Sequence, residues 1–433
     1  MEGQEGLQTV STKLHRIATM AARLKGEVLT TLFHRMDEEM LRTAYRLVRK
    51  DGATGVDKVS GEQYAEHLEE NLKDLYRRLK DQRYLAPMVR AARIPKADGG
   101  VRTLGIPTFE DKIVQKAVSM LLEPVYEQDF LPCSYGFRPK RSAHQALHDL
   151  RTWCMENNVQ WVLDADIKSY FDTIPHAMLQ EIVKKRVNDG NIIRLIGKWL
   201  HTGTVDLKQV SYRDAGTPQG GVISPLLANI YLHEVLDTWF ESEVKPRLRG
   251  RAHLVRYADD FVIGFELEED ARRVYKVLPK RFAKYGLAIH PDKTRLRRFE
   301  KPRSDDHDSD PFDFLGFTHY WAKSLKGNWV IKRKTSRKRL NRTLKAIWAW
   351  CKEHRHDPLP KQYRTLCAKI RGHYQYFGVR TNQAALSKVR HFTERAWKYW
   401  RSRCSSASNI NWVDWKRFLA RHPLPAPRVL HAT

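Results

Sequence analysis

The chain has 433 residues, of which 42% are hydrophobic and 10% aromatic, so it can bury a large core and is predicted to form two or three domains. A mean hydropathy of −0.59 and basic residues scattered through the N-terminus predict no signal peptide and no membrane span, and hence a cytoplasmic protein without a membrane partner. The five cysteines are scattered without a CxxC pair, which argues against a disulfide framework and against a zinc module.

Charge is unevenly distributed along the chain. The formal net charge is +27, and 27 of the 77 basic residues but only four of the 50 acidic ones lie between 321 and 433, together with eight of the twelve tryptophans. Such a concentrated excess repels itself unless a polyanion offsets it. Basic residues interleaved with aromatic ones suit phosphate contact and stacking on unpaired bases, so we expect nucleic acid as the partner.

In chain order, the first predicted element is a hairpin turned by Asp98-Gly99-Gly100. Residues 159–167 and 253–265 are rich in Val, Ile, Leu and aromatic residues, which predicts strands. Residues 268–285 repeat apolar side chains at helical spacing, which predicts a helix. The polar segment 301–311 is typical of a surface loop.

After Trp321 the chain is predicted to be helical. The stretch from Ile331 to Lys345 holds eight basic residues among fifteen and no acidic residue. Apolar residues at helical spacing then form two faces: Leu340, Leu344, Ile347, Trp348 and Cys351, followed by Leu366, Ile370, Tyr374 and Phe377. Amphipathic helices with basic outer faces predict a separate helical domain, and the HPLPAP segment at 422–427 predicts an extended tail.

Two acidic segments carry the strongest chemical signal. Asp259 and Asp260 lie between two β-prone runs, and Asp166 follows the apolar part of the predicted strand 159–167. Asp is also an ordinary turn former, so neither segment decides the chemistry alone. If the three carboxylates meet, each like-charge pair at ~4 Å and an effective dielectric near 20 costs on the order of 4 kcal/mol. Divalent cations offset this cost, and oxygen ligands favour Mg²⁺, so the reaction class would be nucleotidyl transfer with two metal ions.

Nine motifs follow one another over nearly the whole chain: GATGVD (52–57), IPKADGGVRTLGIPTFEDKIVQKA (94–117), SYGFRPKRSAHQAL (134–147), DADIKSYFD (164–172), GTPQGGVISPLLANIYL (216–232), RYADDFVI (256–263), GLAIHPDKT (286–294), FLGF (314–317) and IRGHYQYFGV (370–379). Their order resembles the group II intron reverse transcriptase–maturase family. The resemblance implies an α+β right-hand polymerase with an N-terminal extension and fingers (1–155), a palm (156–320), a helical thumb or maturase domain (321–403) and a short basic segment (404–433), whose DNA binding stays open.

The implied function is RNA-directed DNA synthesis combined with binding of the group II intron RNA to assist splicing and intron mobility. The implied partners are this intron RNA, an RNA template with a DNA primer, dNTPs and target DNA. Two Mg²⁺ ions would be held by Asp166, Asp259 and the backbone carbonyl of Ile167, with Asp260 completing the acidic cluster. Phe171 would exclude a ribose 2′-hydroxyl and so favour dNTPs, although a core aromatic is the alternative interpretation.

The resemblance also assigns the nucleotide contacts. Lys96 and Arg102 would grip the triphosphate, since Arg offers a planar fork and Lys a point charge, although surface solvation is the alternative. Gln219 would line the nucleotide and template pocket, and Lys293 would lie near the leaving pyrophosphate, with proton donation as its hypothetical role. Candidate RNA contacts in the helical domain are Arg337, Lys338, Arg339, Arg342, Lys345, Arg371, His373 and Tyr376.

Three alternatives stay open at this point. The helical domain could hold only the primer–template duplex. The chain could be a non-catalytic RNA-binding splicing cofactor, or a domesticated reverse transcriptase of an antiviral or CRISPR-linked system. Many family members carry a DNA endonuclease module with His-Asn-His-type residues and paired cysteines, which this sequence lacks, so we predict no second-strand cleavage.

Overall fold

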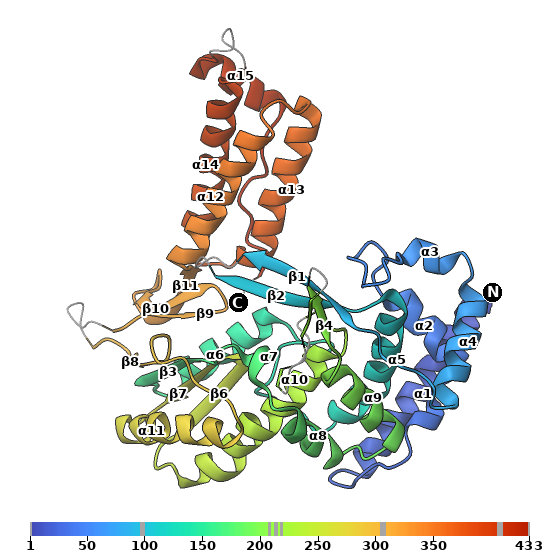
Figure 1. Ribbon diagram of the computed structural model, residues 1–433. Helices are drawn as coiled ribbons and strands as arrows, with labels where there is room; N and C mark the ends of the chain where they lie inside the picture. Colours follow the sequence, from blue (N-terminus) through green and yellow to red (C-terminus); the bar gives the residue numbers. More distant parts are fainter. Residues whose placement is uncertain are drawn as a thin grey trace. The chain divides into compact units, whose positions relative to one another are not determined.

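The computed structural model describes residues 2–95, 100–206, 209–211, 215–216, 220–303, 309–404 and 410–431, and Figure 1 shows the path of the chain. The chain divides into two compact units. Unit 1 comprises Met1–Ala143, Ala165–Phe261 and Arg272–Thr294, and unit 2 comprises His144–Asp164, Val262–Ala271 and Arg295–Thr433. The mixed α and β content confirms the predicted α+β class.

Unit 1 begins with helices that cover a long buried helix. Its helices are α1 (Glu2–Arg23), α2 (Glu38–Leu47), α3 (Gly61–Ala65), α4 (Leu68–Lys80), α5 (Phe109–Tyr126), α7 (Tyr170–Thr173), α8 (His176–Lys184), α9 (Gly190–Leu200) and α10 (Ser224–Leu232), with a short 3-10 turn η1 (Phe33–Arg35). After α10 the chain continues through η2 (His233–Thr238), η3 (Phe240–Val244) and η4 (Lys245–Arg247). In Figure 1, α1 and α2 lie against α5, of which thirteen of eighteen residues are buried.

A four-stranded sheet of order β2-β1-β4-β5 belongs to unit 1. Its strands are β1 (Val89–Pro95), β2 (Val101–Ile106), β4 (Thr204–Asp206) and β5 (Gln209–Ser211). β1 and β2 pair antiparallel with Arg90 opposite Ile106, which confirms the predicted hairpin, whereas residues 96–99 of its turn lie outside the described residues.

A second four-stranded sheet has the order β6-β7-β3-β8, and the division between the units passes through it. Its strands are β6 (Ala252–Tyr257), β7 (Asp260–Phe265), β3 (Trp161–Asp166) and β8 (Arg295–Arg298). The strands predicted at 159–167 and 253–265 are thereby confirmed. So is the predicted helix, which is α11 (Glu268–Lys284). Its helically spaced Ala271, Val274, Leu278 and Phe282 are buried, but Tyr275 is exposed.

Unit 2 contains a three-stranded sheet that the sequence analysis missed. It is formed by β9 (Phe312–Phe314), β10 (Phe317–Lys323) and β11 (Trp329–Thr335), in the order β11-β10-β9. The prediction that the chain is helical from Trp321 is therefore wrong up to Thr335. The physical reason is the period of two in β11, where Ile331, Arg333 and Thr335 are buried in alternation.

The helices of unit 2 are α6 (Ala143–Glu156), which begins at the unit boundary, α12 (Arg337–Glu353), α13 (Leu359–Phe377), α14 (Gln383–Arg401) and α15 (Trp412–Arg421). Figure 1 shows α12, α13 and α14 side by side. Both predicted apolar faces pack into their common core, except that Trp348 stays exposed. Residues 422–427 have no helix, as predicted, and all five cysteines are free. In the described part of the chain, no helix is both long and apolar enough to cross a membrane.

Candidate active site

Asp166 and the hairpin of Asp259 and Asp260 lie at the same edge of the β6-β7-β3-β8 sheet. β3 and β7 are neighbours, and the N–H of Gln160, just before β3, donates to the carbonyl of Phe265, the last residue of β7, at 2.9 Å. The two strands therefore run in opposite directions, so the end of β3 lies beside the start of β7. Asp166 ends β3 and Asp260 begins β7, and all three aspartates are half-buried.

The turn of this hairpin has an uncommon backbone conformation. Ala258, which follows β6 and precedes Asp259, has a φ of 58°, in the left-handed region. For an L-residue other than glycine this conformation costs roughly 1–2 kcal/mol, so the surroundings must hold it. The tight turn places two consecutive carboxylates at the tip of the hairpin.

The backbone carbonyl of Ile167 points away from the neighbouring residues 288–290. The carbonyl of Asp166 accepts from His290 N–H at 2.8 Å, and Lys168 N–H donates to Ala288 carbonyl at 2.8 Å, so Ile167 forms an isolated antiparallel bridge with Ile289. Backbone groups alternate in direction along an extended chain. The carbonyl of Ile167 therefore points to the opposite side from residues 288–290, which is the side of β7 and its aspartates.

Lys293 forms an ion pair with Asp166. Its Nζ lies 2.7 Å from Asp166 Oδ2, and the two side chains are 59% and 35% exposed. An ion pair of this exposure contributes about 0–1 kcal/mol, so a divalent cation can displace the ammonium group at little cost. Lys293 was predicted to lie near the leaving pyrophosphate, and the structure places its ammonium group beside Asp166.

Phe171 lies on α7, just after Asp166 in the chain. Ser169 precedes this helix with a φ of 49°, and the ring of Phe171 is half-buried against the ring of Tyr170 at 5.3 Å between centroids. Tyr170 is buried and donates its hydroxyl to Ala228 carbonyl at 2.5 Å. Burial, with a smaller contribution from the charge of Asp259, raises the pKa of Tyr170 well above its usual range. Tyr170 is thus the core aromatic, and Phe171 keeps part of its ring accessible.

Three predicted nucleotide contacts cannot be placed. Lys96 and Gln219 lie outside the described residues, as does the side chain of Arg102. The structure does describe Val222, three residues after Gln219, and its contact with α5. Gln115 of α5 accepts from Val222 N–H at 2.7 Å and donates to buried Asp111 at 2.9 Å.

The polar contacts around Asp111 were not predicted from sequence. Its carboxylate also accepts from the Tyr84 hydroxyl at 2.6 Å and from the Trp199 indole at 2.8 Å. Burial raises the pKa of Asp111, and these hydrogen bonds to its oxygens oppose the rise. Asp111 and Gln115 both lie in the 94–117 motif, so the available signal was two polar residues at i and i+4 beside the apolar residues Ile113, Val114, Ala117 and Val118 of the same helix.

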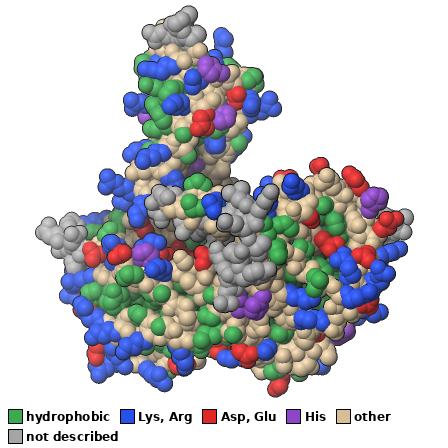
Figure 2. All heavy atoms as spheres, in the orientation of Figure 1, with side chains coloured by type: hydrophobic (Ala, Val, Ile, Leu, Met, Phe, Trp, Pro, Cys, Tyr) green, Lys and Arg blue, Asp and Glu red, His purple; other side chains and the backbone are tan. Residues whose placement is uncertain are grey.

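Five of the predicted RNA contacts form an exposed basic row on α12: Arg337, Lys338, Arg339, Arg342 and Lys345. Arg371 on α13 is also exposed. Figure 2 shows Lys and Arg side chains interleaved with hydrophobic ones over the helices of unit 2. Among the predicted RNA contacts, these five residues form the largest group of exposed cations on one helix.

His373 does not fit its predicted role in RNA contact. Its ring is buried and stacked on Phe377 at 4.7 Å, and burial lowers its pKa to about 4. Tyr376 is half-buried and donates its hydroxyl to Leu315 carbonyl at 2.8 Å. The motif that contains both residues lies on a helix with one buried and one exposed face, so only part of the motif reaches the surface.

The donor set of the candidate metal site consists of oxygen atoms alone. Within the described ranges, no three His, Cys, Asp or Glu side chains gather closely enough to bind one ion together. Mg²⁺ usually takes one or two carboxylates and completes its six ligands with water and substrate phosphates. Asp166, Asp259 and the Ile167 carbonyl fit that requirement, with Asp260 adding negative charge beside them.

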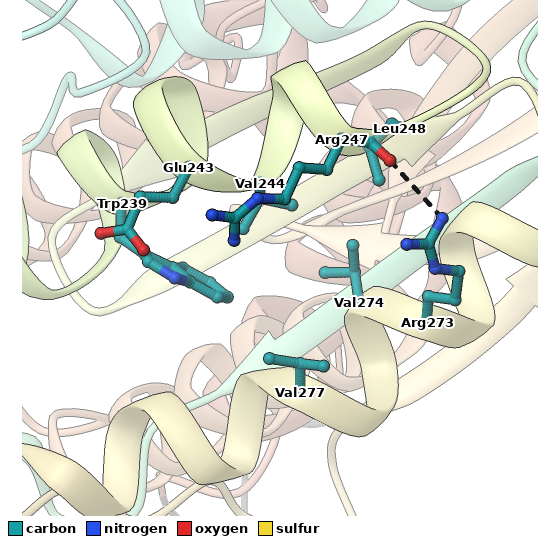
Figure 3. A pocket seen from close by; sticks show the side chains of 8 residues that line it. All are labelled: Trp239, Glu243, Val244, Arg247, Leu248, Arg273, Val274 and Val277. Atoms are coloured by element: carbon teal, nitrogen blue, oxygen red, sulfur yellow. Dashed lines mark hydrogen bonds between the residues drawn. The ribbon is translucent and has the colours of Figure 1, made fainter.

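A separate pocket lies between η3–η4 and α11 (Figure 3). Trp239, Val274 and Val277 form its apolar part, and Arg273 donates to the Arg247 carbonyl at 3.5 Å across its rim. None of the predicted site residues lines it. The chemistry proposed from the sequence therefore belongs to the sheet edge and not to this pocket.

Comparison with known proteins places the chain in a family. Residues 94–319 match the model of the family described as reverse transcriptase (RNA-dependent DNA polymerase). Protein YkfC of Escherichia coli is 33% identical over 362 residues, covering 74% of this chain and 91% of YkfC. Group II intron-encoded protein LtrA of Lactococcus lactis is 36% identical over 382 residues, covering 74% of this chain but 62% of LtrA. Nuclear intron maturase 2 of Arabidopsis thaliana is 30% identical over 33% of this chain and 24% of its own length. The chain belongs to the reverse transcriptase family, and within it resembles the group II intron-encoded proteins and intron maturases.

Proposed function

We propose that this protein is an active RNA-directed DNA polymerase that extends a DNA primer on an RNA template. The observation that carries the proposal is the antiparallel pairing of β3 with β7, which brings Asp166 to the edge of the sheet where Asp259 and Asp260 form the hairpin tip. Two Mg²⁺ ions, when bound, supply activation of the primer 3′-hydroxyl and neutralisation of charge on the triphosphate. Asp166, Asp259 and the Ile167 carbonyl would hold them.

The remaining residues position the substrate. Phe171, part of whose ring is accessible, would exclude a ribose 2′-hydroxyl and so favour dNTPs over rNTPs. Lys293, which pairs with Asp166, would be available to the leaving pyrophosphate if a divalent cation took its place beside that carboxylate. Lys96 and Arg102 would hold the triphosphate from the β1–β2 hairpin, and Gln219 would contact the nucleotide and template.

We further propose that the helical region binds group II intron RNA and assists splicing and mobility. Its support is the exposed basic row on α12, together with the names of LtrA and of the Arabidopsis intron maturase. Exposed aromatic rings beside cations suit unpaired bases. The guanidinium of Arg403, just beyond α14, lies 3.6 Å from the centre of the exposed Tyr399 ring on α14. The centre of the Trp348 ring, on α12, lies 4.9 Å from the centre of the same Tyr399 ring.

In domain terms, we propose fingers within 1–155, a palm within 156–320 and a thumb with maturase function within 321–403. Residues 404–433, with the exposed Trp412, would contact target DNA. This division follows the motifs and differs from the two compact units, since unit 2 also contains His144–Asp164.

Primer extension tests the polymerase. The purified chain, an oligo-DNA primer annealed to RNA, dNTPs and Mg²⁺ should give extended product, and chelation of Mg²⁺ should abolish it. Asp259→Ala should give none while still binding RNA. Absence of Mg²⁺-dependent extension by the wild type, with RNA binding retained, would instead identify a non-catalytic splicing cofactor.

Sequencing of co-purified RNA tests the second part. We expect the RNA bound in cells to be enriched in a group II intron and its flanking exons. Enrichment of unrelated RNA, with the coding frame outside any intron, would favour a domesticated reverse transcriptase.

A further inference from the structure

A buried polar cluster lies directly beneath the hairpin turn. Its centre is Arg256, the penultimate residue of β6, whose side chain is fully buried together with that of Asp237. The Arg256 Nε and Nη2 donate to the two oxygens of Asp237 at 2.7 and 2.6 Å. Two parallel hydrogen bonds fix the plane of the guanidinium and give it a single orientation.

Every N–H of this guanidinium is used. Besides the pair with Asp237, Nη2 donates to Ser134 Oγ at 2.7 Å, and Nη1 donates to Asn229 Oδ1 and to the Ala258 carbonyl, each at 3.0 Å. An arginine has five such donors, and five acceptors surround this one. No other side chain has the charge, the planar shape and the number of donors to satisfy all of them.

The contact with Ala258 is the one that reaches the candidate active site. The carbonyl of Ala258 and the N–H of Asp259 belong to the same planar peptide group. Holding this carbonyl therefore fixes the direction in which the chain enters Asp259. Ala258 is also the left-handed residue of the turn, with a φ of 58°, so its conformation depends on such a contact.

The same cluster joins the hairpin to two distant segments. Asn229 of α10 donates to Gly136 carbonyl at 2.6 Å, and the Ser134 segment pairs with β6 through Arg256 N–H to Cys133 carbonyl at 2.8 Å. Gly136 lies so close to the turn that it has no room for a side chain. The hairpin tip is thus supported from the loop 133–136, from α10 and from η2, the segment that carries Asp237.

We propose that Arg256, oriented by Asp237 and Asn229, is a positioning residue that sets the geometry of Asp259 and thereby the affinity of the candidate site for divalent metal. This inference rests on the proposed function, because it assigns to the buried cluster a role in metal binding by the hairpin. Arg256 itself touches neither substrate nor metal. Supporting groups of this kind typically change metal affinity or activity by about 10- to 100-fold when they are replaced.

The test changes the shape of the side chain at position 256 while keeping its positive charge. Arg256→Lys retains a buried cation beside Asp237 but cannot bridge both Asp237 and Ala258, because its ammonium is a point charge on a flexible stem. We expect the Mn²⁺ affinity of the full chain, measured by electron paramagnetic resonance, to fall about 10- to 100-fold. We expect the Mg²⁺ concentration for half-maximal primer extension to rise correspondingly.

The chain offers a matched control in Arg186, another buried arginine. It donates to Asp129 Oδ2 at 2.7 Å and to the Ala21 carbonyl at 2.9 Å. Its other side-chain hydrogen bonds go to the carbonyls of residues 24 and 27, which are not part of the hairpin. Arg186→Lys should lower the melting temperature without moving the metal affinity. A purely structural role of Arg256 predicts the same behaviour for both variants.

A second variant covers the case in which Arg256→Lys does not fold. Asn229→Ala leaves the Arg256–Asp237 pair intact, removes the bond to Gly136, and should weaken Mn²⁺ binding in a folded chain. Mn²⁺ affinities of Arg256→Lys, or of Asn229→Ala, within twofold of the wild type would overturn the proposal. If the wild type does not extend primers but the variants still lose Mn²⁺ affinity, the positioning role stands and the polymerase proposal fails.

Discussion

Gly136→Ala should disable the candidate active site from outside it. A Cβ at this position would lie 2.3 Å from the backbone nitrogen of Ala258, 2.9 Å from the carbonyl carbon of Tyr257 and 3.0 Å from Ala258 Cα. All three are backbone atoms, so no side-chain rotation relieves the contact. Ordinary van der Waals contact begins at 3.4 Å, so the turn and the loop must separate by about 1 Å.

The displaced turn carries Asp259, and this sets the expected magnitude. A misplacement of about 1 Å in a catalytic group can cost on the order of 100-fold in rate. Overpacking of a close contact costs about 1–3 kcal/mol of stability, which most domains of this size withstand. We therefore expect a folded variant whose single-turnover primer extension on RNA is slowed by about 100-fold.

Gly190→Ala is the matched control for this experiment. Gly190 begins α9, and nothing lies within 4 Å of an added Cβ, so this variant should extend at the wild-type rate. A Gly136→Ala variant that is folded by circular dichroism and extends at the wild-type rate would refute the reasoning. It would show that the hairpin tip tolerates displacement.

Further predictions concern the nucleotide, RNA binding and pH. Phe171→Ala should raise rNTP incorporation relative to dNTP incorporation, which single-nucleotide extension measures; unchanged selectivity would assign Phe171 to packing alone. Intron RNA binding should depend less on salt when four residues are neutralised together: Arg337, Lys338, Arg339 and Arg342. Each phosphate contact contributes about −0.7 to −0.9 to the slope of log binding constant against log salt concentration. An unchanged slope in a salt titration would place the RNA surface elsewhere. Burial holds the pKa of His319 at about 3, whereas it titrates near 6.5 when unfolded, so stability is full above pH 6.5 and falls as the pH drops. At pH 5 the loss of unfolding free energy from His319 alone is about 2 kcal/mol. The free energy of unfolding in urea should therefore differ less between pH 7 and pH 5 in His319→Gln than in the wild type. An equal difference in the two proteins would contradict this prediction.

Much of the fold was predictable because its elements follow simple periodicities. The strands that end at Asp166 and flank the hairpin are apolar runs, and α11 repeats its buried residues at helical spacing. β11 escaped prediction because its basic residues Lys332, Arg333 and Lys334 masked a period of two. Arg333 is 2% exposed, so charge alone was a poor guide to its location.

The geometry of the candidate site was predictable only in part, because it depends on residues far apart in the sequence. Adjacent aspartates in a hairpin are visible in the sequence, but the placement of Asp166 at the same edge of the sheet depends on the strand order. His373 was assigned to RNA contact because it lies in a motif with Arg371, but a separation of two residues on a helix means a rotation of about 200°, so Arg371 is exposed and His373 is buried. Arg256 was visible in the RYADDFVI motif, but its five acceptors come from residues 134, 229, 237 and 258, which only the folded chain brings together.

The most direct measurement is the anomalous scattering of Mn²⁺ in crystals of the chain bound to a primer–template and an incoming dNTP. We expect metal between the carboxylates of Asp166 and Asp259, within ligand distance of the Ile167 carbonyl. Metal bound elsewhere, or coordinates in which Asp166 lies well away from the hairpin, would contradict this expectation.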